Sequence, residues 1–81
     1  MPSTPQTDPQ DVAIRDDMIR LGQFLKLAGV AEDGIEVKAL LAEAAVTVNG
    51  EIEARRGRQL NRGDVIGIEA PVGWTYLRVS G

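Results

Sequence analysis

The sequence predicts an α+β domain in which two short helices pack on a small β-sheet whose strands are mainly antiparallel. Two patterns predict this class: apolar residues recur at helical spacing in two segments between residues 21 and 44, and they alternate with polar residues in several short segments after residue 45. The third observation is the length. With 81 residues the chain is shorter than most domains, so we expect a single hydrophobic core.

The first eleven residues are expected to form a flexible tail. Three of the four prolines stand there among polar side chains, and such a composition buries too little apolar surface to offset the entropy lost on ordering. The single domain then spans residues 12–81, with a core of about residues 18–69. Residues 12–14 are apolar and fit either a first edge strand or a loop.

The first predicted helix begins near Leu21 and ends before Gly29, because glycine readily takes the positive φ of a helix end. Its apolar stripe consists of Leu21, Phe24, Leu25 and Ala28. Gln23 and Lys26 fall on the opposite side of this helix, and Arg20 lies at its N-terminal edge. These three polar side chains form a candidate contact surface, although a lone helix lysine is most often simply solvated.

A second helix is predicted to begin after Asp33, which can cap it, and Glu36 three residues later completes a capping-box pattern. Its apolar stripe consists of Val37, Leu40, Leu41 and Ala44. Glu36 and Glu43 lie on one flank of the stripe and Lys38 on the other, so Lys38 can face an anion. Because the helix carries few charges, chance explains this distribution equally well.

An Asn49-Gly50 pair between two alternating segments predicts a hairpin over residues 46–53. The turn is expected to be type I′, since both central residues accept positive φ. We expect the second strand to continue through an arginine-rich stretch, residues 55–60. Glu51 and Glu53 are interpreted as exposed, solubilising acids of this strand without a chemical role.

The C-terminal third predicts two more strands. Residues 61–64 have the composition of a turn, residues 65–68 that of a strand, and residues 73–79 that of the last strand of the sheet. Trp74 and Tyr76 share one face of the last strand. In so small a protein, packing on the core or covering the sheet is a more common use of such residues than base stacking.

Charge is unevenly distributed along the chain. The formal net charge is −3, with 9 Lys and Arg against 12 Asp and Glu, which by itself argues against a polyanionic partner. Four of the acids lie in the first seventeen residues beside a single base, so the rest of the chain is neutral. Within that rest, four arginines stand together without an acid: Arg55, Arg56, Arg58 and Arg62. This local cluster is a candidate anion-binding surface.

The chain contains neither cysteine nor histidine. Their absence excludes thiol nucleophiles, histidine acid-base catalysis and the common zinc sites, so we expect no catalytic residue, no metal and no cofactor. The longest purely apolar run, residues 39–42, is far too short to cross a bilayer. A cytoplasmic protein without membrane association is therefore expected.

The order of these segments resembles the S4 RNA-binding domain, in particular the small stand-alone S4-like proteins of bacteria. The matching segments are residues 19–29 and 34–43 for the two helices, 46–51 for the hairpin, 53–60 for the arginine-rich stretch, and 63–66 for the turn and following strand. The resemblance implies the αL motif of the S4 family, here with additional strands. It also implies RNA binding without catalysis.

The partner implied by this resemblance is a structured RNA, in particular ribosomal RNA or a ribosomal particle. Seven residues are implied as RNA contacts: Arg20, Gln23, Lys26, Lys38, Arg55, Arg56 and Arg58. Arginine presents a planar fork of donors to phosphate oxygens, and structured RNA is read largely through its backbone and shape. The chain departs from the family at Asp33-Gly34, where many S4 domains have Ser-Arg. A monomer is expected, because the sequence shows no long exposed apolar stripe that a second copy would have to cover.

Two alternatives from other classes remain open. The arginine cluster could bind an acidic protein, and such an interaction module would use the same residues. A ubiquitin-like sulfur carrier of the β-grasp type also contains a Val-Asn-Gly segment and a Gly-Asp turn. That class needs a terminal Gly-Gly and opens with a β-hairpin, whereas this chain ends in Val79-Ser80-Gly81 and places two helices before the hairpin.

Overall fold

The structure, a computed structural model, describes residues 9–71 and 73–81. Its elements are β1 (Gln10–Ala13), β2 (Met18–Arg20), α1 (Leu21–Leu27), α2 (Gly34–Ala42), β3 (Val46–Val48), β4 (Glu51–Ile52), β5 (Gln59–Asn61), β6 (Val65–Ala70) and β7 (Gly73–Ser80). Five strands form one sheet in the order β1-β7-β6-β3-β4, and β2 and β5 form a second, two-stranded sheet. The predicted α+β class is confirmed, and among the strands of residues 9–71 and 73–81 only β1 and β7 pair in parallel.

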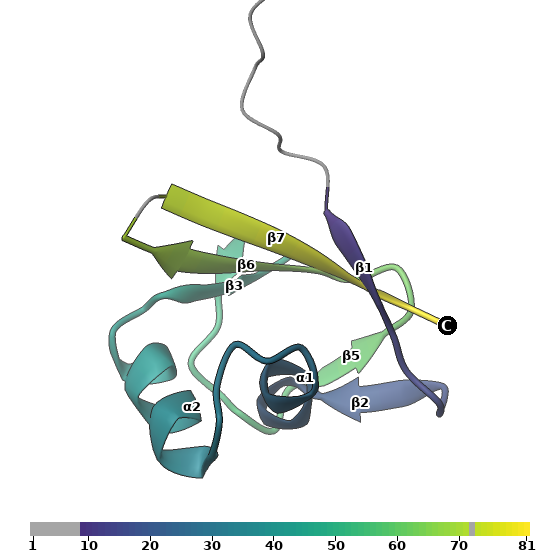
Figure 1. Cartoon of the computed structure of the whole chain (residues 1–81), viewed down its shortest axis with the longest axis horizontal. Coiled ribbons are helices and arrows are strands. Elements are labelled where there is room, and N and C mark those ends of the chain that lie inside the picture. Colours follow the sequence, from purple (N-terminus) through teal and green to yellow (C-terminus); the bar gives the residue numbers. More distant parts are fainter. Residues whose placement is uncertain (1–8, 72) are drawn as a thin grey trace, which may run out of the picture.

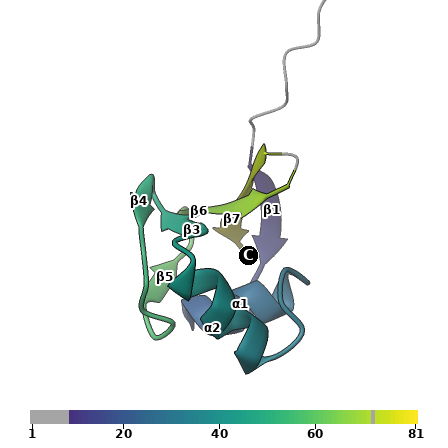
Figure 2. The same cartoon turned by 90° about the vertical axis from the view of Figure 1, so that its left-hand side faces the viewer.

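The two helices lie on one side of the five-stranded sheet, and the β2-β5 pair lies beside α1 (Figure 1, Figure 2). The hydrophobic core fills the space between these layers. Its largest fully buried side chains are Phe24, Leu21, Leu25, Leu60, Ile66, Val37, Val46 and Val79. Because α1 has only 7 residues, its stability comes from packing its buried face rather than from helix propensity.

Strand β1 begins earlier than the sequence predicts. Residues 1–8 of the expected tail lie outside the described residues, but Gln10 and Asp11, which were expected in that tail, belong to β1. The strand pairs with β7 at the edge of the sheet, and Arg78 Nε donates to Asp11 Oδ1 at 2.8 Å. Backbone pairing with β7 thus orders a segment whose own composition does not favour order.

The ends of both helices follow the local chemistry of the sequence. Gly29 has a φ of 78° just after α1, and Asp33 Oδ1 accepts a hydrogen bond of 2.9 Å from the Glu36 amide at the start of α2. One predicted member of the second stripe is wrong. Ala44 lies beyond the last residue of α2 with a φ of 57° and is exposed, because the helical periodicity stops at Ala42.

The predicted hairpin is confirmed. Asn49 and Gly50 have φ values of 52° and 91°, as a type I′ turn requires, and they join β3 to β4. The Asn49 side chain also ties the hairpin to the start of β6, since its Oδ1 accepts from the Val65 amide at 2.9 Å and its Nδ2 donates to Asp64 Oδ1 at 3.1 Å. The turn at residues 61–64 is likewise present, with Gly63 at a φ of 98°.

The strand predicted through residues 55–60 is wrong. Strand β4 ends at Ile52, residues 53–58 form a loop, and only Gln59–Asn61 is a strand, which pairs with β2 rather than continuing the hairpin. We call residues 53–58 the arginine loop. Strand β2 has no signal of its own in the sequence, because its three residues are too few to show a period of two.

The aromatic residues of β7 lie on the side of the sheet away from the helices. Leu77 and Val79, which alternate with them, are buried in the core. Tyr76 covers Gly67 on the neighbouring strand, where a Cβ atom would stand only 2.9 Å from Tyr76 Cε1. Trp74 is 42% exposed. It therefore does not pack into the core, which was one of the uses expected from the sequence.

Candidate nucleic-acid interface

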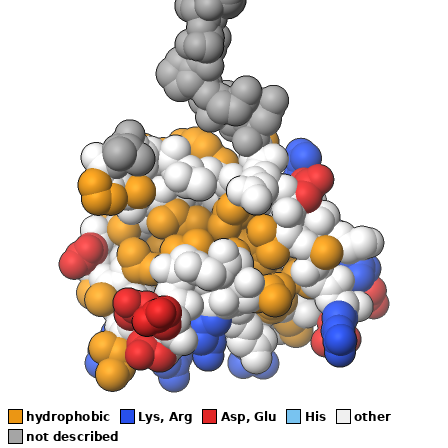
Figure 3. Space-filling model, in the orientation of Figure 1, with side chains coloured by type: hydrophobic (Ala, Val, Ile, Leu, Met, Phe, Trp, Pro, Cys, Tyr) orange, Lys and Arg blue, Asp and Glu red, His pale blue; other side chains and the backbone are white. Residues whose placement is uncertain are grey.

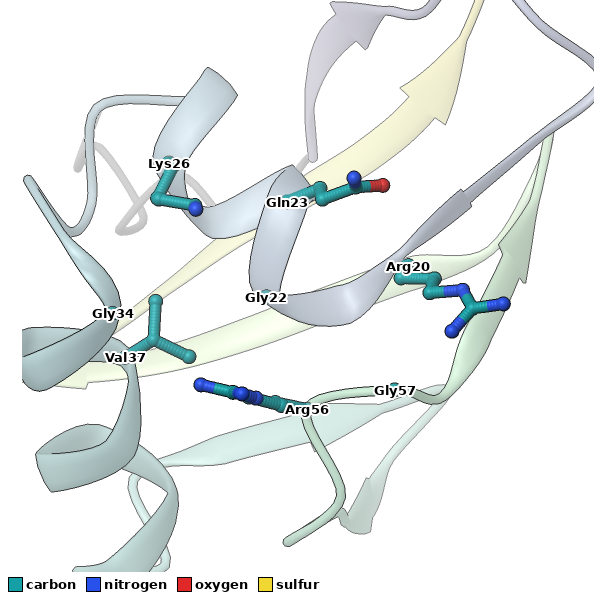
Figure 4. A pocket seen from close by; sticks show the side chains of 8 residues that line it. All are labelled: Arg20, Gly22, Gln23, Lys26, Gly34, Val37, Arg56 and Gly57. Carbon is teal, nitrogen blue, oxygen red and sulfur yellow. The ribbon is translucent and has the colours of Figure 1, made fainter.

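A shallow depression lies where α1, the first turn of α2 and the arginine loop meet (Figure 4). Its volume is about 280 Å³, and it is lined by Arg20, Gly22, Gln23, Lys26, Gly34, Val37, Arg56 and Gly57. Three lining residues are glycines, one from each of these elements. Gly22 is buried against Arg56, whereas Gly57 is exposed with nothing within 4 Å of the place of its missing Cβ, so a ligand can approach the backbone closely at Gly57.

The arginine loop lies against α1 because its carbonyls cap that helix. Arg20 occupies the N-cap position without a capping side-chain hydrogen bond. The Leu21 amide instead donates to the Arg58 carbonyl at 2.8 Å, and the Gly22 amide donates to the Arg56 carbonyl at 2.9 Å. Two amides that a helix start leaves without intrahelical partners are thereby satisfied. These bonds hold the loop arginines beside the cations of α1.

A buried carboxylate holds the loop in shape. Glu53 is only 8% exposed, which contradicts the expectation of an exposed, solubilising acid. Its Oε2 accepts from the Arg55 amide at 3.0 Å and from Arg55 Nε at 3.1 Å, and its Oε1 accepts from Arg58 Nη1 at 2.8 Å. Hydrogen bonds from the Arg55 side chain, then from Arg58, lower the pKa of Glu53 to about 2. This carboxylate therefore stays ionised over the whole physiological range.

Arg56 forms neither a hydrogen bond nor an ion pair with this carboxylate. In Figure 4 its guanidinium extends from the loop toward Gly34 and Val37. A Cβ atom on Gly34 would lie 3.8 Å from Arg56 Nη1, so the lack of a side chain at residue 34 leaves room beside the guanidinium. Arg56 also lines a second depression together with Lys38, and it therefore connects the cation of α2 with those around α1.

The cations of this region differ in their partners. Within residues 9–71 and 73–81, four of them form no ion pair: Arg20, Lys26, Lys38 and Arg56. Arg55 and Arg58 are both paired with Glu53. Of the acids in the N-terminal part, Asp11 pairs with Arg78 and Asp17 with Arg62. Asp16 forms no ion pair within the described residues and lines a depression with Gln23 and Lys26.

The seven residues implied as RNA contacts lie at the end of β2, on the two helices and in the arginine loop. Four of them line the first depression (Arg20, Gln23, Lys26 and Arg56), Lys38 lines the second, and Arg55 and Arg58 line a third beside Gly57. We call the seven residues together the helix-loop face. In Figure 3, lysine and arginine side chains gather along the lower edge of the molecule, where Figure 1 places α1, α2 and β2.

Comparison with known proteins decides the family. The family model of the S4 domain matches residues 12–72, which is most of the chain. The chain belongs to the S4 domain family. Within that family, this S4 domain is similar to a protein of Bacillus subtilis (strain 168) named "Probable ribosome maturation protein RlbA". The two are 52% identical over 58 residues, which cover 72% of this chain and 82% of that protein.

Membership of the S4 family confirms the resemblance, and it points to RNA binding rather than to catalysis. The β-grasp alternative disagrees with the structure, because β1 pairs with β7 and β2 with β5, so the described part of the chain does not open with a β-hairpin. Among the described residues, no helix is long and apolar enough to cross a membrane.

Proposed function

We propose that this protein binds structured RNA, and ribosomal RNA in particular, through the helix-loop face and acts by binding alone. The observation that carries the proposal is a set of four cations that form no ion pair within the described residues. Arg20, Lys26 and Arg56 line one depression together with three glycines, and Arg56 lines the next one together with Lys38. The open shape of these depressions suits a phosphate backbone, which is broad and lies on a surface, better than it suits a small enclosed substrate.

The chemistry of the face supports this choice of ligand. Arg20 and Arg56 can each present two parallel N–H donors to a phosphate, and Lys26 and Lys38 add point charges. Gln23 adds an amide that can bond to a base edge or a 2′-hydroxyl. Binding should release counterions from the RNA, so the affinity is expected to fall steeply as salt rises.

The relative's printed name supports ribosomal RNA as the target. That relative is named for ribosome maturation, and the chain shares half of its residues with it over the matched length. We therefore propose that the protein acts in the cytoplasm as a monomer. It would bind ribosomal particles and recognise a fold of their RNA during assembly.

The test is a titration of the intact protein with a ribosomal RNA hairpin, followed by backbone amide NMR at about 50 and then 200 mM salt. We expect shifts in α1, the first half of α2 and the arginine loop that fade at the higher salt. Shifts confined to the Trp74 side of the sheet would contradict the proposed face. If an acidic peptide of equal charge shifts the same amides more strongly than the RNA, the protein-interaction alternative takes its place.

A further inference from the structure

We propose that Glu53 is a positioning residue of the helix-loop face, which holds the arginine loop so that Arg56 is presented to the RNA. The inference rests on the proposed function and deepens it, because Glu53 itself would touch no RNA. It assigns a role to an acid that lies within a surface otherwise suited to anions.

The first step is the contact between Glu53 and the loop. Both carboxylate oxygens are used, and together they accept four hydrogen bonds from Arg55 and Arg58. The Glu53 side chain is 10% exposed whereas that of Arg55 is 76% exposed, so the acid lies beneath the arginines rather than beside them. A further bond of 3.2 Å from the Arg58 amide to the Arg55 carbonyl closes the turn between them.

The second step connects this turn to α1. Arg58 donates from its guanidinium to Glu53 and accepts from the Leu21 amide through its carbonyl. Arg56, two residues earlier, accepts from the Gly22 amide in the same way. The carboxylate thus holds Arg55 and Arg58, and the backbone carbonyls of Arg56 and Arg58 accept from the first turn of α1. Arg56 lies in the stretch of backbone between these contacts.

The third step is the place of Arg56 on α1. The Cβ atom of Arg56 lies over Gly22, where an added Cβ would be in van der Waals contact with it at 3.5 Å, and the guanidinium extends toward Gly34 and Val37 (Figure 4). A loop of different shape would direct this side chain elsewhere. Because the position of Arg56 depends on the loop and the loop on the carboxylate, Glu53 acts on binding through Arg56.

Simple electrostatics predicts the opposite effect of removing this acid. An acid near a phosphate-binding surface repels RNA, so its neutralisation should strengthen binding. A positioning role predicts weaker binding, since the loop loses the shape that presents Arg56. The direction of the change therefore separates the two roles.

The experiment compares Glu53→Gln with Glu51→Gln for binding to a ribosomal RNA hairpin at about 100 mM salt. Glu51 is an exposed acid of β4, two residues before Glu53, and its side chain forms no hydrogen bond in the described part of the chain. Both variants therefore lose one negative charge, but only Glu53→Gln alters contacts within the loop. We expect Glu53→Gln to bind at least about three-fold more weakly than the wild type, and Glu51→Gln to bind equally or more tightly. Equal or tighter binding by Glu53→Gln would overturn the proposal.

A second readout needs no RNA. Hydrogen exchange of the Leu21 and Gly22 amides should accelerate about ten-fold or more in Glu53→Gln, while the amides of β6 and β7 change much less. Equal acceleration everywhere would show a general loss of stability and refute a positioning role. If the wild type binds no RNA, the proposed function fails, yet the exchange measurement still decides whether Glu53 holds the loop.

Should Glu53→Gln fail to fold, Glu53→Asp replaces it in both measurements. Aspartate keeps the charge but is one methylene shorter, so it cannot reach both arginines in the same geometry. We expect weaker RNA binding and faster exchange at Leu21 and Gly22. Wild-type behaviour in both would show that only the charge matters, which contradicts positioning.

Discussion

Three arginines that stand almost side by side in the sequence have different surroundings in the structure. Arg55 and Arg58 share the carboxylate of Glu53, whereas Arg56 forms no ion pair within the described residues. An arginine whose donors are already engaged offers fewer of them to a phosphate, so Arg56 should contribute more to RNA binding than its neighbours. Residue type alone does not distinguish the three.

The replacement Arg56→Ala tests this difference. We expect weaker binding to ribosomal RNA, and a slope of log affinity against log salt that is about one unit less steep, because one phosphate contact is lost. Thermal unfolding should barely change, since this guanidinium bonds to no other side chain in the described part of the chain. Arg62→Ala is the matched control: Arg62 pairs with Asp17 outside the helix-loop face, and its removal should leave the slope unchanged.

Acid should weaken the contact between Glu53 and its arginines. The pKa of Glu53 is lowered from its ordinary value of 4.5 to about 2 by hydrogen bonds from Arg55 and Arg58. A lowered pKa means that the stabilisation is complete above about pH 5 and is lost as the pH falls from about 4.5 toward 2. Urea unfolding of the wild type and Glu53→Gln should differ most near pH 6 and converge toward pH 2. Parallel curves over this range would contradict the assignment.

At the scale of elements, the arginine loop does two tasks. Its carbonyls cap α1, and its side chains supply three of the seven residues of the helix-loop face. Helix α2 is capped differently, by the side chain of Asp33. The two helix starts are therefore stabilised independently, and a change at one should leave the other intact.

Removing the cap of α2 should affect stability but not the face. We expect Asp33→Ala to lower the free energy of unfolding by about 0.5 to 2 kcal/mol, because the Glu36 amide loses its acceptor. Urea denaturation measures the loss. Asp16→Ala provides the comparison, since Asp16 is exposed and accepts no side-chain hydrogen bond within the described residues. RNA affinity weaker than wild type in folded Asp33→Ala would contradict the independence of the two helices.

At the scale of the whole molecule, the five-stranded sheet separates two surfaces. The helices occupy one side (Figure 1). Tyr76 and Trp74 face the other side, because they alternate along β7 with Leu77 and Val79, which are buried in the core. On the side of Tyr76, the side chains of Thr47 and Tyr76 from the neighbouring strands occupy the place where a Cβ atom of residue 67 would stand. Stability on that side can thus be altered without touching the helix-loop face.

Gly67→Ala is expected to destabilise the protein by about 1 to 3 kcal/mol through overpacking. The new Cβ would stand 2.9 Å from Tyr76 Cε1, and Thr47 Oγ1 is closer still, so at least one of the two side chains or its strand must move. Thermal or urea unfolding provides the measurement. Gly57→Ala adds the same methyl group where nothing lies within 4 Å, and its stability should remain close to that of the wild type. Equal losses in the two variants would show that the close contact at Gly67 does not matter.

The sequence by itself determined those elements whose signals are local. Gly29 ends α1, Asp33 begins α2 and Asn49-Gly50 makes the hairpin turn, because each depends on the φ preference or the hydrogen-bonding groups of residues a few positions apart. Family membership followed from the order of these signals. The resemblance to the S4 family supplied the seven proposed contact residues, which the structure brings together.

Only the tertiary structure decided the shape of the arginine loop and the role of Glu53. Strand β5 follows the loop directly and pairs with β2, and the loop carbonyls accept from the first amides of α1. Both β2 and these amides of α1 lie more than thirty residues before the loop in the sequence. The alternation around Glu53 indicated an exposed strand, whereas a buried acid is stable only with donors to its charge, which Arg55 and Arg58 supply. Whether Glu53 is buried, and whether its charge finds donors there, depends on the complete fold, so no local pattern of residues predicts it.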